Sequence, residues 1–253
     1  MVVAAGSGAL ITAIRVDIRR LHDGWMGIAF PRQRMAQHNV LGRWRPQTTT
    51  GQITYWAWFA LGTPLVLLLY PLVLAGFVLR FQATKLDDTA RRIGIIGVII
   101  VSLIAWGLLT VYALFQLSTE GFLAVGAAGL AATVSAALAF IFVRVGGRGT
   151  TVLLAYPFVM TAIFLPPVVA ALYSPFLGRT ILPWSYDFAI FILDNILHVF
   201  GINEFLRANF TLEGYAYVGM WFGISVPVGW FIGLLVTLAD VVRPKKSRQD
   251  RQH

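Results

Sequence analysis

Four polar side chains accompany one otherwise apolar stretch, residues 188–201 (FAIFILDNILHVFG). An aspartate and a histidine one helical turn apart can share a proton, because imidazole titrates near neutral pH. Ionisable groups at membrane depth commonly serve ion or proton paths and pair with one another. The candidates for such a polar path are Asp187, Asp194, Asn195 and His198.

A helix over 183–200 is predicted to position these residues. Pro183 suits a first helical turn and Gly201 a position just past the end. At 100° per residue, Asp194 and His198 fall within about 20° of Asp187, so the polar residues form one stripe. An aspartate at mid-membrane costs about 2.5–3.5 kcal/mol, against gains of about 0.3–0.6 kcal/mol for each Leu, Ile, Phe or Val. Two alternatives stay open: a sixth span that lines an interior cavity, and a helix on the membrane surface with a hydrated edge.

Other site chemistries find little support. Asp-x-x-x-His supplies two metal ligands with no second histidine nearby, and the chain has no cysteine. The motifs GxxxxGK[ST], GxSxG and HExxH are absent from the sequence. The basic termini lack a motif for reading bases or phosphates. We therefore expect no enzymatic activity, no cofactor, no metal and no nucleic-acid partner.

Composition indicates the environment of the chain. Of 253 residues, 58% are hydrophobic and 12% charged, against roughly 25% charged in typical soluble domains. A membrane-spanning helix needs about 20 mostly apolar residues. We therefore expect an all-α, polytopic membrane protein with about five to six hydrophobic segments packed in a bundle. The uncharged stretches are 52–79, 93–117, 121–143, 151–173 and 214–239, with 183–200 as the possible sixth.

The chain divides by composition into 1–51, 52–242 and 243–253. In the first part, apolar residues recur at helical spacing with arginines on the other faces. This pattern predicts an amphipathic helix along the membrane surface; the alternative is an ordinary helix packed on the rest of the protein. The apolar positions are Ile11, Ile14, Ile18, Leu21 and Trp25.

The net charge of +9 is concentrated at both ends of the chain, which predicts cytoplasmic termini. Six spans would leave 13 Lys and Arg inside and 7 outside. If 52–79 instead re-enters, bent at its prolines, and 183–200 stays on the outer surface, the division is 18 to 2. Five simple spans with the N-terminus outside would give a poorer division of 11 inside to 9 outside. A cysteine at Thr84, in the predicted loop 80–92, distinguishes the two arrangements.

Small residues predict faces for helix packing, because helices in lipid associate through close backbone approach. They are Ala124, Ala128, Ala132 and Ala136 in one stretch and Gly219, Gly223, Gly229 and Gly233 in another. Prolines within the apolar stretches predict either static kinks or broken helices that line a cavity.

These features favour a non-enzymatic structural or assembly component of a membrane complex. Its expected partners are the lipid bilayer and other membrane subunits or copies of itself. Its expected location is a cell membrane, either the cytoplasmic membrane of a prokaryote or a host membrane for a virus-encoded chain. The alternative is a permease or channel subunit with a polar path near Asp194 and His198.

Overall fold

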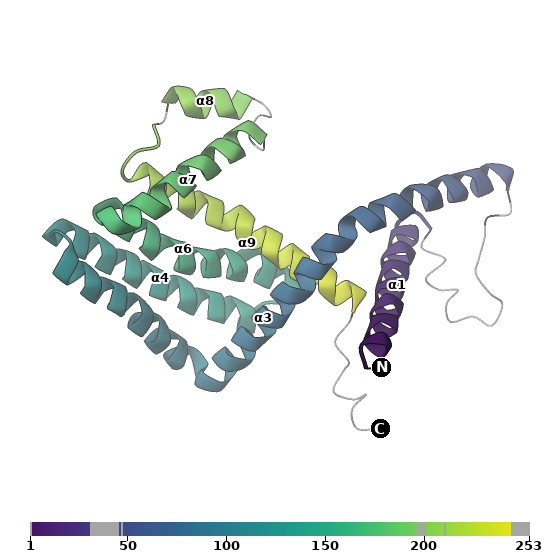
Figure 1. Ribbon diagram of the computed structural model, residues 1–253, viewed down its shortest axis with the longest axis horizontal. Helices are drawn as coiled ribbons and strands as arrows, with labels where there is room; N and C mark the ends of the chain where they lie inside the picture. The colour runs from purple at the N-terminus through teal and green to yellow at the C-terminus, as the bar shows by residue number, and fades with distance from the viewer. Residues whose placement is uncertain are drawn as a thin grey trace. The chain divides into compact units, whose positions relative to one another are not determined.

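The chain is helical throughout the part that the structure describes. The computed structural model describes residues 2–30, 46, 48–195, 197, 201–209 and 211–243. Every regular element in these ranges is a helix (Figure 1), which confirms the predicted all-α class for them. The elements are α1 (Val2–Ala29), α3 (Thr49–Gln116), α4 (Thr119–Val145), α5 (Arg148–Thr150), the π-helical turn η1 (Thr151–Ala155), α6 (Tyr156–Tyr173), α7 (Pro175–Asn195), α8 (Ile202–Asn209) and α9 (Ala216–Val242).

Among the described residues, four helices are long and apolar enough to cross a membrane. They are α3, α4, the stretch Arg148–Tyr173 formed by α5, η1 and α6, and α9. The 68 residues of α3 correspond to about 100 Å of helix at 1.5 Å per residue, added over the parts before and after Gly94, which is roughly three times the hydrocarbon thickness. This helix contains 52–79 and all of 93–117 except its last residue, so it is long enough for two crossings. The count of five to six spans stays a prediction.

The interruption inside α3 lies at a glycine and not at its prolines. Pro64 and Pro71 are inside continuous helix, whereas Gly94 has φ 68° and ψ −175°. That backbone region is accessible almost only to glycine. A re-entrant turn at the prolines of 52–79 is therefore not what the structure shows.

The predicted loop 80–92 is helical, which corrects the sequence interpretation. Arg91 Nε donates to Asp87 Oδ2 at 2.9 Å, one helical turn away. Such pairs at i and i+4 stabilise helices. Alanine, leucine, lysine and arginine also favour helix over turn, so the polar composition marks an exposed helical segment.

The helices belong to two compact units. The first comprises Met1–Gln82 and Leu235–His253, and the second comprises Ala83–Leu234. The first unit therefore contains α1, the first part of α3 and the last turns of α9. The second contains the remaining helices.

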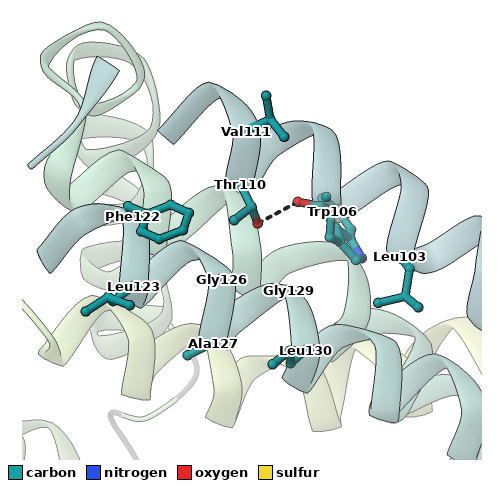
Figure 2. Close-up of a pocket in the computed structure, with 11 residues that line it drawn as sticks. Leu103, Trp106, Thr110, Val111, Phe122, Leu123, Gly126, Ala127, Gly129 and Leu130 are labelled. Carbon is teal, nitrogen blue, oxygen red and sulfur yellow. Dashed lines mark hydrogen bonds between the residues drawn. The ribbon is translucent and has the colours of Figure 1, made fainter. Parts of the chain in front are cut away.

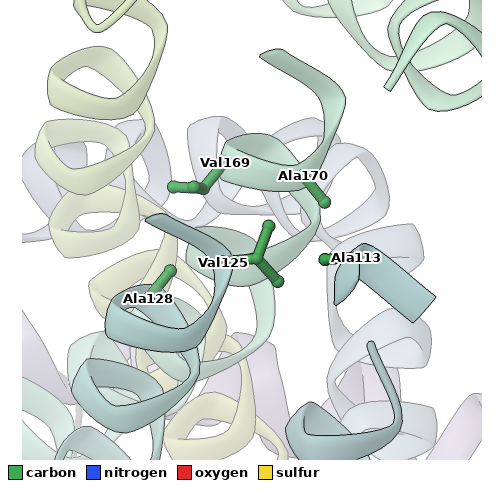
Figure 3. Close-up of a cluster of buried hydrophobic side chains, with 5 residues drawn as sticks. All are labelled: Ala113, Val125, Ala128, Val169 and Ala170. Carbon is green, nitrogen blue, oxygen red and sulfur yellow. The ribbon is translucent and has the colours of Figure 1, made fainter. Parts of the chain in front are cut away.

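Small side chains form the core of the second unit. Within it α4 packs along α6, and α6 packs along α7. Figure 3 shows the buried cluster that the end of α3, α4 and α6 share. Alanine and valine allow helix backbones to approach closely, which is the main source of packing energy in lipid. The cluster consists of Ala113, Val125, Ala128, Val169 and Ala170.

A proline and a tryptophan join α9 to the start of α6. Pro157 has no N–H, so the carbonyl of Leu153, four residues earlier, lacks its usual helical donor. Trp230 Nε1 of α9 donates to that carbonyl at 3.0 Å. The π-helical turn η1 immediately precedes Pro157. The irregular backbone thus provides an acceptor for a neighbouring helix.

Trp230→Phe is expected to lower the free energy of unfolding by about 0.5–1.5 kcal/mol, because Leu153 O loses a donor. Thermal unfolding in detergent measures the change. Trp184→Phe is the matched control, since the Trp184 side chain is 77% exposed. An equal effect of both substitutions would show that the hydrogen bond contributes nothing.

In the first unit, α1 packs against the beginning of α3. The indoles of Trp25 and Trp58 stack with centroids 4.3 Å apart. Each indole N–H donates to the other residue's carbonyl oxygen, at 3.0 Å and 3.1 Å. Met26 is buried, whereas Ile11 and Ile14 are exposed. The helix therefore matches the packed alternative, and contact between its exposed isoleucines and a membrane stays a prediction.

Candidate functional site

The polar stripe lies on the exposed face of α7. Asp187, Asp194 and Asn195 are all exposed. The Asn195 amide donates to the Phe191 carbonyl oxygen of the same helix at 2.9 Å. His198 lies outside the described residues, so the predicted proton sharing with Asp194 is not tested.

α7 begins at Pro175, not at Pro183, which corrects the predicted start of this helix. The Ser174 hydroxyl accepts a hydrogen bond from the Leu177 amide at 3.3 Å. Serine before a first-turn proline is a strong helix start. Pro183 therefore lies inside α7, and the described helix ends at Asn195.

Asp194 forms an ion pair with α8. Arg207 Nη2 lies 2.6 Å from Asp194 Oδ1, and the Asn203 amide donates to the same oxygen at 3.4 Å. Asn203 Oδ1 in turn accepts from Arg207 Nε at 2.7 Å. A guanidinium does not release its proton in proteins. This pair therefore joins α8 to α7.

Aromatic side chains share the exposed face of α7 with the two aspartates. Phe176 and Trp184 are each 77% exposed, and Phe191 is 53% exposed. Aromatic and charged side chains occur together where a helix lies at the membrane–water interface. The face supports the surface-helix alternative for Asp187 and Asp194.

The opposite face of α7 is joined to α6 and α9 by a polar contact inside an aromatic cluster. Trp221 Nε1 donates to Ser185 Oγ at 2.9 Å, and Ser185 Oγ donates to the Ile181 carbonyl oxygen at 2.7 Å. The Trp221 ring lies 4.8 Å from that of Phe164 and 5.6 Å from that of Phe188. Nothing local in the sequence distinguishes Ser185, because its partner is far along the chain.

The predicted alanine face lies partly in the core of the second unit. Ala128 and Ala132 are buried, and Ala124 and Ala136 are half-buried. A second polar contact joins α3 to α4, where the buried hydroxyls of Ser102 and Thr133 lie 3.1 Å apart. The predicted alanine face therefore packs, in part, against other helices of the same chain.

The predicted glycines of α9 divide into two pairs. Gly229 and Gly233 are buried, and a Cβ on Gly229 would lie 2.4 Å from Pro157 N. Gly219 and Gly223 are exposed, and a Cβ on either would have no neighbour within 4 Å. The first pair therefore packs inside the second unit, and the second pair leaves an open face.

A cluster of charged residues at the end of α9, Asp17, Arg80, Asp240 and Arg243, was not predicted from the sequence. The Asp17 side chain is 1% exposed, and its carboxylate accepts from Arg243 Nε at 2.8 Å and from Arg243 Nη2. The hydrogen bond with Asp17 raises the pKa of Arg243 above its ordinary value. We call these four residues the α9-end cluster.

Arg80 of α3 supplies donors to the last turn of α9. Its Nη1 donates to the carbonyl oxygens of Ala239 at 3.0 Å and Arg243 at 2.6 Å. Its Nε lies 3.2 Å from Asp240 Oδ1. The C-terminal end of a helix carries partial negative charge, so a guanidinium there is favourable. In the sequence, the only local signal for these contacts is that Arg80, Asp240 and Arg243 border apolar stretches.

An open groove of about 610 Å³ lies between the second part of α3 and α4. Figure 2 shows that the Thr110 hydroxyl bonds to the carbonyl oxygen of Trp106, at 2.9 Å, within its own helix. The lining is otherwise apolar and includes Leu103, Val111, Phe122 and Leu130. Such a groove suits hydrocarbon, and the residues that line it include no ionisable side chain.

Within the described ranges, no three His, Cys, Asp or Glu side chains lie close enough to hold a metal ion. No protein-family model, curated protein or solved structure matches the chain. Any functional statement therefore rests on the residues of this chain.

Proposed function

We propose that the chain is an integral multi-pass membrane protein that acts as a non-enzymatic structural or assembly component of a membrane complex. Large apolar side chains are exposed along its candidate spans, as at Leu68 and Phe115, each 77% exposed. Soluble proteins rarely carry extended apolar surfaces. Lipid or neighbouring subunits would cover these side chains.

One observation carries the structural role: polar groups within the second unit join helices to one another. Ser102 contacts Thr133, Ser185 contacts Trp221, and Trp230 contacts Leu153. The aspartates of α7, in contrast, lie on its exposed face. Contacts between helices stabilise a bundle, whereas a transport path needs ionisable groups that line its interior.

Purification in mild detergent tests the assembly role. We expect the 27.9 kDa chain to elute as a homo- or hetero-oligomer, measured by light scattering with the detergent mass subtracted. The exposed pair Gly219 and Gly223 offers a contact face, and single cysteines there would cross-link to a neighbouring subunit without background, because the chain has no cysteine. A monomer that transports a solute in proteoliposomes would refute the proposal.

Asp194→Asn and His198→Ala distinguish this role from the alternative of a permease or channel subunit. We expect both variants to keep the oligomeric mass of the parent, and Asp194→Asn to change stability by less than about 1 kcal/mol, because its ion pair is exposed. Proton and ion flux in proteoliposomes supplies the second measurement. Flux that the parent shows and either variant abolishes would favour the permease.

A further inference from the structure

The α9-end cluster bears on which side of a membrane the segment after Arg80 lies. α9 ends at Val242, and the charged Arg243 follows directly. The end of a span that is followed by charge lies at the membrane surface. Arg80 bonds to Ala239 and Arg243, so it is at that same surface.

Further contacts within the first unit fix the same arrangement. Asp17 of α1 pairs with Arg243, and Arg20 Nη1 donates to the Val242 carbonyl oxygen at 3.2 Å. Arg80 pairs with Asp240. Two separate parts of the chain, α1 and the first part of α3, thus contact the end of α9 through charged side chains.

We infer that residues 83–92 lie on the same side of the membrane as the C-terminus and that this side is cytoplasmic. The inference rests on the membrane placement in the proposed function. Residues 85–92 hold Lys85, Asp87, Asp88, Arg91 and Arg92. Charges at this density do not enter hydrocarbon, so the chain stays on Arg80's side until residue 93.

Crossings counted from residue 93 agree with this placement. With α7 on the membrane surface, since it is not among the helices apolar enough to span, the stretches 93–117, 121–143, 151–173 and 214–239 form an even number of crossings. An even number returns the chain to its starting side. The six-span arrangement instead places 80–92 opposite the C-terminus, where Arg80 could not reach the end of α9. The contacts therefore exclude six simple crossings.

The distribution of basic residues identifies the side. Between residues 80 and 243, the opposite side holds only Arg179 and Arg207. An excess of Lys and Arg marks the cytoplasmic side, where anionic headgroups attract them. The C-terminal side holds Arg80, Lys85, Arg91, Arg92, Arg144, Arg148 and Arg243.

Single-cysteine labelling in intact cells tests the inference, and the cysteine-free chain gives no background. We expect Thr84→Cys, Thr89→Cys and Ser247→Cys to resist an impermeant maleimide until the membrane is permeabilised. Thr211→Cys, between the third and fourth of these crossings, should label at once. Thr89 supplies a second position if Thr84→Cys fails to accumulate.

Labelling of both Thr84→Cys and Thr89→Cys in intact cells, with Ser247→Cys protected, would overturn the inference. Labelling of Ser247→Cys with protection of Thr211→Cys would overturn the cytoplasmic assignment. If the protein were not integral to the membrane, carbonate washing would release it from the membrane fraction. That result is distinct from any labelling pattern. A monomeric elution profile would count against the assembly role and leave the sidedness result standing.

Discussion

Arg243→Ala is expected to lower the free energy of unfolding by about 2–3 kcal/mol, because it leaves the buried carboxylate of Asp17 without its partner. The Asp17 side chain is 1% exposed and that of Arg243 is 46% exposed. Removing one partner of a fully buried ion pair would lower the free energy of unfolding by more than this. Arg243 is partly exposed, so solvent screening reduces the expected loss. Thermal unfolding of the detergent-solubilised chain measures it.

A matched control is Arg91→Ala, since Arg91 pairs with Asp87 at 2.8 Å but neither side chain is buried, at 56% and 32% exposed. We expect that control to change stability by about 0.5 kcal/mol or less. The double variant Asp17→Asn with Arg243→Gln should recover part of the loss, because two neutral amides can bond where a lone carboxylate cannot. Equal losses for Arg243→Ala and Arg91→Ala would mean that Asp17 is not buried in the folded protein.

Gly229→Ala is the second substitution for which we expect a large effect. A Cβ there would lie 2.4 Å from Pro157 N and 2.6 Å from Pro157 Cα. Both are backbone atoms, so α9 and α6 would have to separate, and this would also weaken the Trp230 contact with Leu153. The expected loss is about 1–3 kcal/mol, typical of overpacking, measured by thermal unfolding.

Gly223→Ala makes the same chemical change in the same helix, at a position with nothing within 4 Å of the added atom. Alanine is the better helix former, so stability should stay unchanged or rise by up to about 1 kcal/mol. A loss at Gly223 as large as that at Gly229 would contradict the packing of α9 on Pro157. A fall in oligomeric mass with Gly223→Ala alone would instead locate a subunit contact on the open face.

The sequence contained enough information to predict the helices, because backbone groups in hydrocarbon must bond within their own segment. Runs of about 20 apolar residues therefore predict helices without reference to the rest of the chain. The stretches 121–143, 151–173 and 214–239 match α4, η1 with α6, and α9 closely, whereas 52–79 and 93–117 both fall within the single helix α3. Local signals predicted the ends of helices less well. The predicted loop 80–92 is helical, and α7 starts at Pro175 instead of Pro183.

Only the tertiary structure decided which polar residues meet. Asp194 has Arg207 as its partner, thirteen residues away, and Asp17 has Arg243, 226 positions away. The spacing of Asp194 and His198 suggested a pair because helical periodicity acts over a few residues. Pairing between distant segments depends on how helices pack, and that leaves no mark in local composition. The sequence therefore determined the helices and their preference for a hydrocarbon environment. Packing determined which charged side chains are buried and which are exposed.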